Sequence, residues 1–207
     1  ETFVSAPDQV MMMRISADKA GKVSLRAGYT CQLRATVSAE GGCMVLDGIA
    51  PSQVDPSYVN SEDPVIYEED PKKKGMRFCA MLSIRQKGGT VTELPEGLEV
   101  TGADSVTLYL AARTSFNGPF RQPFLEGKPY RENCLKDLRA AGESDYDALA
   151  ARHVEDYRTY FNRVQIDLGA GREELPTPER LADWDQDVDP ARYALLFQYG
   201  RYLLIAS

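Results

Sequence analysis

The segment that most constrains this chain is the last one, residues 191–205, which carries apolar side chains on nearly every side of a helix. Its composition favours a helix, and Asp189 and Pro190 supply an N-cap and a proline at the first helical position. A helix that is apolar around its whole circumference is normally buried on all sides. The 207-residue sequence leaves no other segment to cover it. We therefore expect the chain to be cut from a larger protein.

Composition excludes several classes of protein. Apolar residues at 43% and charged residues at 27% are ordinary values for a globular chain. The formal charge of −7 argues against a nucleic-acid partner, which would require clustered Lys or Arg. The only dense basic run, residues 72–74, is flanked by acidic residues and is interpreted as a solvated loop. No apolar stretch approaches the roughly 18 residues of a membrane span.

Residues 2–110 have the alternating pattern of β-strands. Residues 50–75 are rich in proline and acidic residues and predict a loop. The glycine pairs 41–42 and 88–89 predict hairpin turns, and neither precedes a helix as a phosphate-binding loop would. Many short strands at this spacing imply an antiparallel β-sandwich, in a mainly β chain with some α. The expected strands are residues 10–16, 23–27, 31–37, 43–49, 76–86, 91–94, 98–101 and 105–112, the last one buried on both faces.

The hydrophobic period becomes helical after residue 130. Residues 146–164 repeat apolar side chains every three or four positions, which predicts an amphipathic helix of about five turns with Ser144 as its N-cap. Residues 164–169 alternate and predict a short returning strand. A further helical section is expected to open at Pro176, with Thr177 as N-cap.

The cysteines and the only histidine suggest no catalytic or metal site. Cys31, Cys43, Cys79 and Cys134 contain no Cys-x-x-Cys motif, and no second histidine completes a zinc site. Cys79 is interpreted as a buried thiol in an apolar strand, and the disulfide state of all four is left open. His153 lies on the apolar stripe of its helix, so a core or interface histidine is preferred over an acid–base group.

The remaining candidates also favour structural roles. Arg201, inside the apolar helix, must find a carboxylate or carbonyl partner, and we interpret it as a clamp between domains rather than a substrate contact. The spacing of Asp185, Asp187 and Asp189 is like that of the first ligands of a calcium loop. However, Pro190 and Leu196 stand where that loop requires Gly and Glu.

A solvated acidic linker that caps a helix, including Asp183, is therefore preferred over a metal site. Four aromatic residues near loops could stack on sugar faces, although local packing is preferred: Phe116, Phe120, Phe124 and Trp184. No catalytic, cofactor-binding or metal residue is assigned.

Three strings in the C-terminal third resemble glycoside hydrolase family 95, the inverting α-L-fucosidases. They are HVEDY at residues 153–157, LPTPERL at 175–181 and LFQYGRYLLI at 196–205. The strings PDQV at 7–10 and GADSVTLYLAA at 102–112 resemble later strands of that family's N-terminal β-domain. The resemblance covers nearly the whole chain and is weakest in residues 50–74.

The resemblance implies a piece of a long enzyme. It implies later strands of an incomplete, galactose-mutarotase-like β-sandwich over residues 1–127 and a helical linker with a short strand over 128–175. It also implies the start of an (α/α)6 barrel over 176–207. The family's catalytic residues lie further along the barrel, so none is carried onto this chain. The parent is expected to be secreted or periplasmic, to need no cofactor and to act on fucosylated glycans.

Two hypotheses follow. In the first, the chain is a non-catalytic part of an enzyme that removes terminal α-L-fucose with inversion, with α-L-galactosides left open as substrates. In the second, it is a stand-alone carbohydrate-binding or interaction sandwich with a helical tail. An incomplete sandwich would expose sheet edges and apolar surface, so association into dimers is expected. A coding sequence that continues with more helices would exclude the second hypothesis.

Overall fold

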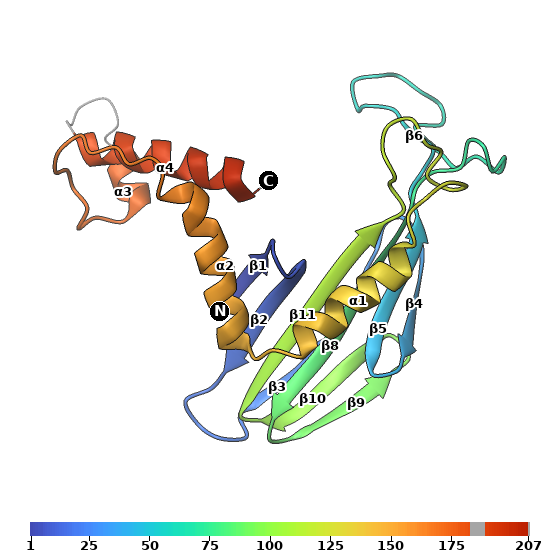
Figure 1. Ribbon diagram of the computed structural model, residues 1–207, viewed down its shortest axis with the longest axis horizontal. Coiled ribbons are helices and arrows are strands. Elements are labelled where there is room, and N and C mark those ends of the chain that lie inside the picture. Colours follow the sequence, from blue (N-terminus) through green and yellow to red (C-terminus); the bar gives the residue numbers. More distant parts are fainter. Residues whose placement is uncertain (183–188, 207) are drawn as a thin grey trace. The chain divides into compact units, whose positions relative to one another are not determined.

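A computed structural model describes residues 1–182 and 189–206 (Figure 1). The chain divides into two compact units, Glu1–His153 and Val154–Ser207, which are described separately here. The division expected from the resemblance, after residues 127 and 175, stays a prediction. None of the described helices is long and apolar enough to cross a membrane.

The first unit is built on two antiparallel sheets, which confirms the predicted sandwich. The larger sheet has the strand order β1-β2-β11-β8-β5-β4, and the smaller has the order β3-β10-β9. The strands of the larger sheet are β1 (Thr2–Ser5), β2 (Val10–Ser16), β4 (Arg34–Glu40), β5 (Cys43–Ile49), β8 (Arg77–Lys87) and β11 (Ser105–Thr114). Those of the smaller sheet are β3 (Val23–Ala27), β9 (Thr90–Leu94) and β10 (Gly97–Ala103).

Alternation along the strands gives the larger sheet two apolar faces. Even-numbered residues of β8 and β11, such as Leu82 and Val106, pack toward the smaller sheet with Leu98 and Val100. Odd-numbered residues, such as Met81, pack toward helices on the other face. The central strand β11 therefore contributes to the core on both faces, as its continuous apolar run predicts.

The helices α1 (Tyr130–Gly142) and the start of α2 (Tyr146–Phe161) cover that second face (Figure 1). α1 lies within the expected helical linker of residues 128–175, but the sequence pattern does not mark its bounds. Its signal is short, because only Cys134, Leu138 and Ala141 form its buried stripe. α2 starts at Tyr146 as expected, but its N-cap lies one residue later than predicted. Asp145, rather than Ser144, is the N-cap, because its Oδ1 accepts a hydrogen bond from the Ala148 N–H at 2.8 Å.

One predicted hairpin turn is wrong. Residues 87–90 join β8 of the larger sheet to β9 of the smaller one, so the turn is a corner between sheets. Gly88 and Gly89 both have positive φ, of 69° and 65°. A Cβ on Gly89 would lie 2.4 Å from the Thr101 carbonyl oxygen. Glycine is therefore required at position 89, where this corner packs against the backbone of residues 101–103.

Two other strand predictions need correction. The expected strand at residues 31–37 is observed three residues later as β4, and it pairs with β5 through a turn at Gly41 and Gly42. The prediction of a strand at residues 164–169 is wrong, because an alternating pattern alone does not supply the partner strand that a ladder requires. The expected loop at 50–75 contains only two short paired segments, β6 (Gln53–Val54) and β7 (Val65–Ile66).

The second unit contains the rest of α2, then α3 (Thr177–Ala182) and α4 (Pro190–Ala206). The helical section opens at Pro176 as expected, but Thr177 is the first residue of α3 and Pro176 is its N-cap residue. The Pro176 carbonyl accepts hydrogen bonds from the N–H groups of Glu179 and Arg180. The apolar segment forms the predicted helix α4, with Asp189 as N-cap. Most of its large apolar side chains are exposed, up to 78% at Leu204. The second unit by itself therefore does not bury this helix.

Candidate functional site

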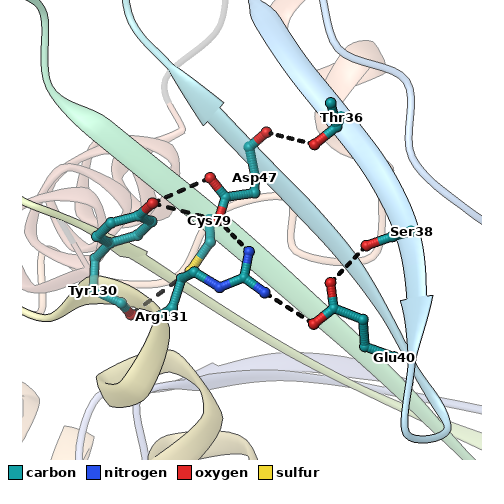
Figure 2. A network of polar contacts seen from close by, with 7 residues as sticks. All are labelled: Thr36, Ser38, Glu40, Asp47, Cys79, Tyr130 and Arg131. Atoms are coloured by element: carbon teal, nitrogen blue, oxygen red, sulfur yellow. Dashed lines mark hydrogen bonds and ion pairs between the residues drawn. The ribbon is translucent and has the colours of Figure 1, made fainter.

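A polar network holds the N-terminal end of α1 against strands β4 and β5 (Figure 2). Asp47 of β5 lies at its centre. Its Oδ1 accepts a hydrogen bond from the Tyr130 hydroxyl at 3.1 Å, and its Oδ2 accepts one from Arg131 Nη1 at 2.5 Å. Arg131 Nη2 donates to Glu40 Oε2 at 2.9 Å, and Ser38 Oγ donates to Glu40 Oε1 at 2.8 Å.

The contacts of this network shift the pKa values of Tyr130, Arg131 and Glu40. Burial, followed by the nearby Asp47 carboxylate, raises the pKa of the Tyr130 hydroxyl. The hydrogen bond to Asp47 raises the pKa of Arg131. The hydrogen bond from Ser38, and then the one from Arg131, lower the pKa of Glu40. Because the pKa of Tyr130 is raised and that of Glu40 is lowered, the network suits a structural clamp rather than proton transfer.

Two grooves lie beside this network in the first unit. The larger, of about 740 Å³, runs between α1 and strands β5 and β8 and is lined by Arg131, Arg139 and Met81 among others. The smaller, of about 560 Å³, is lined by residues that include Asp47 and Phe124. An inverting glycosidase needs two carboxyl groups facing each other across a sugar and a water. The carboxylates of this network, Asp47 and Glu40, are instead engaged with Arg131.

The second unit has its own ion pair, which fixes the start of α4. Arg180 is buried and donates from Nε and Nη2 to the two carboxylate oxygens of Asp189, at 2.8 and 2.9 Å. Asp189 Oδ1 also accepts from the backbone N–H of Arg192 at 3.2 Å. These contacts, with that of Arg180 first, lower the pKa of Asp189 to about 2. The capping role predicted for Asp189 is confirmed, but the residue is buried and paired rather than solvated.

Arg201 finds the carbonyl partners that the sequence predicts. Its guanidinium donates to the carbonyl oxygens of Val164 at 2.6 Å, Phe161 at 2.7 Å and Tyr160 at 3.3 Å. Tyr160 and Phe161 end α2, where helix carbonyls lack helical partners, and Val164 follows the helix. Arg201 therefore joins α4 to the end of α2 within the second unit. It is a clamp, but not one between the two compact units of the structure.

The other candidate residues occupy ordinary structural positions. His153 is half-buried and stacks on the Phe3 ring at 5.2 Å between centroids. Phe124 lies beneath the Arg77 guanidinium at 4.1 Å, whereas Phe120 is 97% exposed. Phe116 is also exposed. Trp184, Asp183, Asp185 and Asp187 lie outside the described residues.

The cysteines are free thiols in this structure. Cys79 is buried in the apolar core, as predicted, and Cys134 is buried beside it. Cys43 is half-buried and Cys31 is exposed. Over residues 1–182 and 189–206, no group of three His, Cys, Asp or Glu side chains could hold a metal ion.

Sequence reasoning missed Asp47 and Arg131. Asp47 is an acidic residue in a strand that is otherwise apolar or small, Cys43–Ile49, and Arg131 lies one residue into α1. A charged residue in such a strand signals a buried partner. Its identity depends on which helix covers the sheet, which the sequence pattern does not specify.

Comparison with known proteins assigns the chain to a family. Residues 1–119 match the model of the glycosyl hydrolase family 65 N-terminal domain, and residues 145–207 match that of the glycosyl hydrolase family 95 catalytic domain. A putative kojibiose phosphorylase from human microbiome matches 77% of this chain and 21% of its own, at 9% identity and a TM-score of 0.43.

Two relatives match over the whole length of this chain. Alpha-L-fucosidase 2 of Arabidopsis thaliana is 32% identical over 218 residues, and probable alpha-fucosidase A of Aspergillus niger is 30% identical over 220 residues. The matches cover 26% and 25% of those proteins, so the chain spans about a quarter of their length. The chain belongs to the glycosyl hydrolases that have a family 65-type N-terminal domain, and its predicted resemblance to family 95 is confirmed.

Proposed function

We propose that this chain is a supporting, non-catalytic part of a glycoside hydrolase that removes terminal α-L-fucose from glycans with inversion. The observation that carries the proposal is the whole-length match to Alpha-L-fucosidase 2, of which the chain spans 26%. The match of residues 145–207 to a family 95 catalytic domain model supports it. The paired carboxylates described above support a structural role for this piece.

The test compares this chain with the longer protein that contains it, using an aryl α-L-fucoside. The longer protein is expected to hydrolyse the substrate and to release β-L-fucose first, as followed by NMR of the anomeric proton. The chain alone is expected to release none. Turnover by the chain alone at the rate of the longer protein contradicts the supporting role. Activity on an aryl α-L-galactoside alone contradicts the assigned substrate.

Helix α4 supplies the surface for the rest of the protein in this proposal. Its exposed apolar residues, such as Leu196 and Leu203, suit packing against further helices of the same polypeptide. In the isolated chain the same surface promotes a homodimer.

The parent is proposed to be exported, and recovery of the full-length protein only from the cytoplasm would contradict that part.

A further inference from the structure

Two buried thiols meet beneath α1, and the proposed function uses neither. Cys79 of β8 and Cys134 of α1 are 1% and 0% exposed and belong to one apolar cluster. Each sulfur contacts the backbone of another element. Cys134 Sγ donates to the carbonyl oxygen of Ala111 in β11 at 3.2 Å, and Cys79 Sγ donates to that of Tyr130 in α1 at 3.6 Å. Each cysteine side chain therefore reaches from its own element to the backbone of the other layer, across the interface between α1 and the sheet.

The local geometry brings the two sulfurs together. Tyr130 lies one helical turn before Cys134, so both are on the same face of α1. On the sheet, Cys79 is paired with Arg113, two residues beyond Ala111 on the same face of β11. Both thiols lie in the same buried cluster, and the mutual influence of the two sulfurs lowers the pKa of Cys79 and raises that of Cys134.

We propose that Cys79 and Cys134 form a disulfide that ties α1 to β8 when the protein folds in the presence of a small-molecule disulfide such as oxidised glutathione. The Cys79 thiolate attacks one sulfur of the small disulfide and releases one thiolate from it. Cys134 then loses its proton to water, attacks the Cys79 sulfur and releases the second thiolate. Two cysteine thiols are oxidised, and one small disulfide is reduced to two thiols.

The environment determines when this bond forms. Both sulfurs are accessible while the chain folds and are covered once α1 has packed on the sheet. A disulfide formed during folding is thus shielded afterwards from exchange with solvent thiols. The other two cysteines, Cys31 and Cys43, serve as controls because neither is fully buried beneath α1. Cys31 is exposed, and burial raises the pKa of the half-buried Cys43.

The experiment refolds the full-length protein in a mixture of reduced and oxidised glutathione. Free thiols are blocked with N-ethylmaleimide before tryptic digestion without reductant. Trypsin places Cys79 in peptide 78–85 and Cys134 in peptide 132–136. We expect the two peptides to be linked, with the loss of two hydrogens, and to separate on reduction. Recovery of both peptides as maleimide adducts, or linked to Cys31 or Cys43 instead, would overturn the proposal.

Variants separate the cross-link from a packing effect. The Cys31→Ser/Cys43→Ser variant is expected to keep the linked peptides, and Cys134→Ala to lose them while Cys79 becomes blocked. In the wild type, Tm of the oxidised form should exceed that of the reduced form by on the order of 5–10 °C. That difference should vanish in Cys134→Ala. If it persists there, the disulfide is not its source. If Cys134→Ala does not fold, peptide mapping of the wild type still decides.

Discussion

Asp47 couples the sheet to the helix more directly than its neighbours do. It is half-buried on β5, and both of its acceptor oxygens bind side chains at the start of α1, Tyr130 and Arg131. A partly buried carboxylate with charged and neutral donors contributes more than an exposed ion pair, because less of its interaction is screened by water. Glu40 accepts from the same arginine but is 51% exposed.

Replacing Asp47 with Asn should lower the free energy of unfolding by about 1–2 kcal/mol. The expected loss of unfolding free energy is no larger, because the Arg131 side chain is 38% exposed and water screens part of the interaction. Urea unfolding followed by far-UV circular dichroism measures the loss. Glu40→Gln is the matched control, and a change below about 0.5 kcal/mol is expected for it. Equal losses in the two variants would contradict the central place of Asp47.

Asp189 makes the stability of the second unit depend on pH. Its folded pKa of about 2 lies below the ordinary aspartate value of 3.8. The folded form therefore binds fewer protons than the unfolded form between these values, and its stability rises with pH there. The contribution should be fully present above about pH 4 and lost as the pH falls toward 2.

This pH dependence is measured by urea unfolding at several pH values between 2 and 7. The Asp189→Asn variant should lack the part of the dependence between about pH 4 and pH 2. Glu179→Gln, an exposed acid on the neighbouring helix α3, should retain it. A wild-type curve identical in shape to that of Asp189→Asn would contradict the assignment.

Among the elements, α2 ends where a side chain from α4 takes over its carbonyl groups. The last carbonyls of a helix have no partners within it, and a cation there also suits the helix dipole. Arg201 meets both conditions at Tyr160 and Phe161, and its further bond to Val164 holds the chain that leaves the helix. Residues 164–169 are therefore fixed near Val164 by a side chain rather than by strand pairing.

Arg201→Met should loosen the end of α2. Removing the donors should raise the rate of amide hydrogen exchange across residues 158–164 by about 5- to 30-fold, which corresponds to 1–2 kcal/mol of local stability. The exchange rate in Arg201→Lys should fall between those of the wild type and Arg201→Met. A lysine ammonium lacks the planar, forked donors of a guanidinium and cannot bind all of these carbonyls at once. Hydrogen-exchange mass spectrometry gives both rates. Unchanged exchange in Arg201→Met would exclude the clamp.

For the whole molecule, the two units differ in how completely they bury their apolar residues. The first unit has cores on both faces of its larger sheet. In the second, α4 exposes large apolar residues along its length, including Leu196 and Leu204. A contiguous apolar surface of this kind usually marks an interface.

The isolated chain should therefore self-associate through α4. Sedimentation velocity should show dimers or larger species for the wild type, and mainly monomer for Leu196→Glu/Leu204→Glu, because buried unpaired carboxylates would oppose the contact. Val54→Glu, at an exposed apolar position outside α4, is the control and should associate like the wild type. Far-UV circular dichroism checks that α4 still forms. A monomeric wild type would exclude this interface.

The sequence predicts the elements better than their partners. The strands Val10–Ser16, Val23–Ala27 and Cys43–Ile49 have the predicted bounds, because a period of two and flanking turn residues are local properties. The expected hairpin at Gly88 and Gly89 is instead a corner, since a two-glycine turn allows both geometries and only the packing of the two sheets selects one.

The candidate site shows the same division. Asp189 is recognisable as a cap because capping depends on adjacent residues, and Arg201 is recognisable as needing a partner because it interrupts an apolar helix. Local pattern thus determined the kinds of elements, the apolar character of α4 and the family resemblance. Only the tertiary structure decided that Asp47 binds Arg131, that Asp189 binds Arg180 and that Cys79 and Cys134 share one buried cluster. Each of these pairs joins residues of different elements or their caps, whose meeting depends on which faces the folded chain buries together.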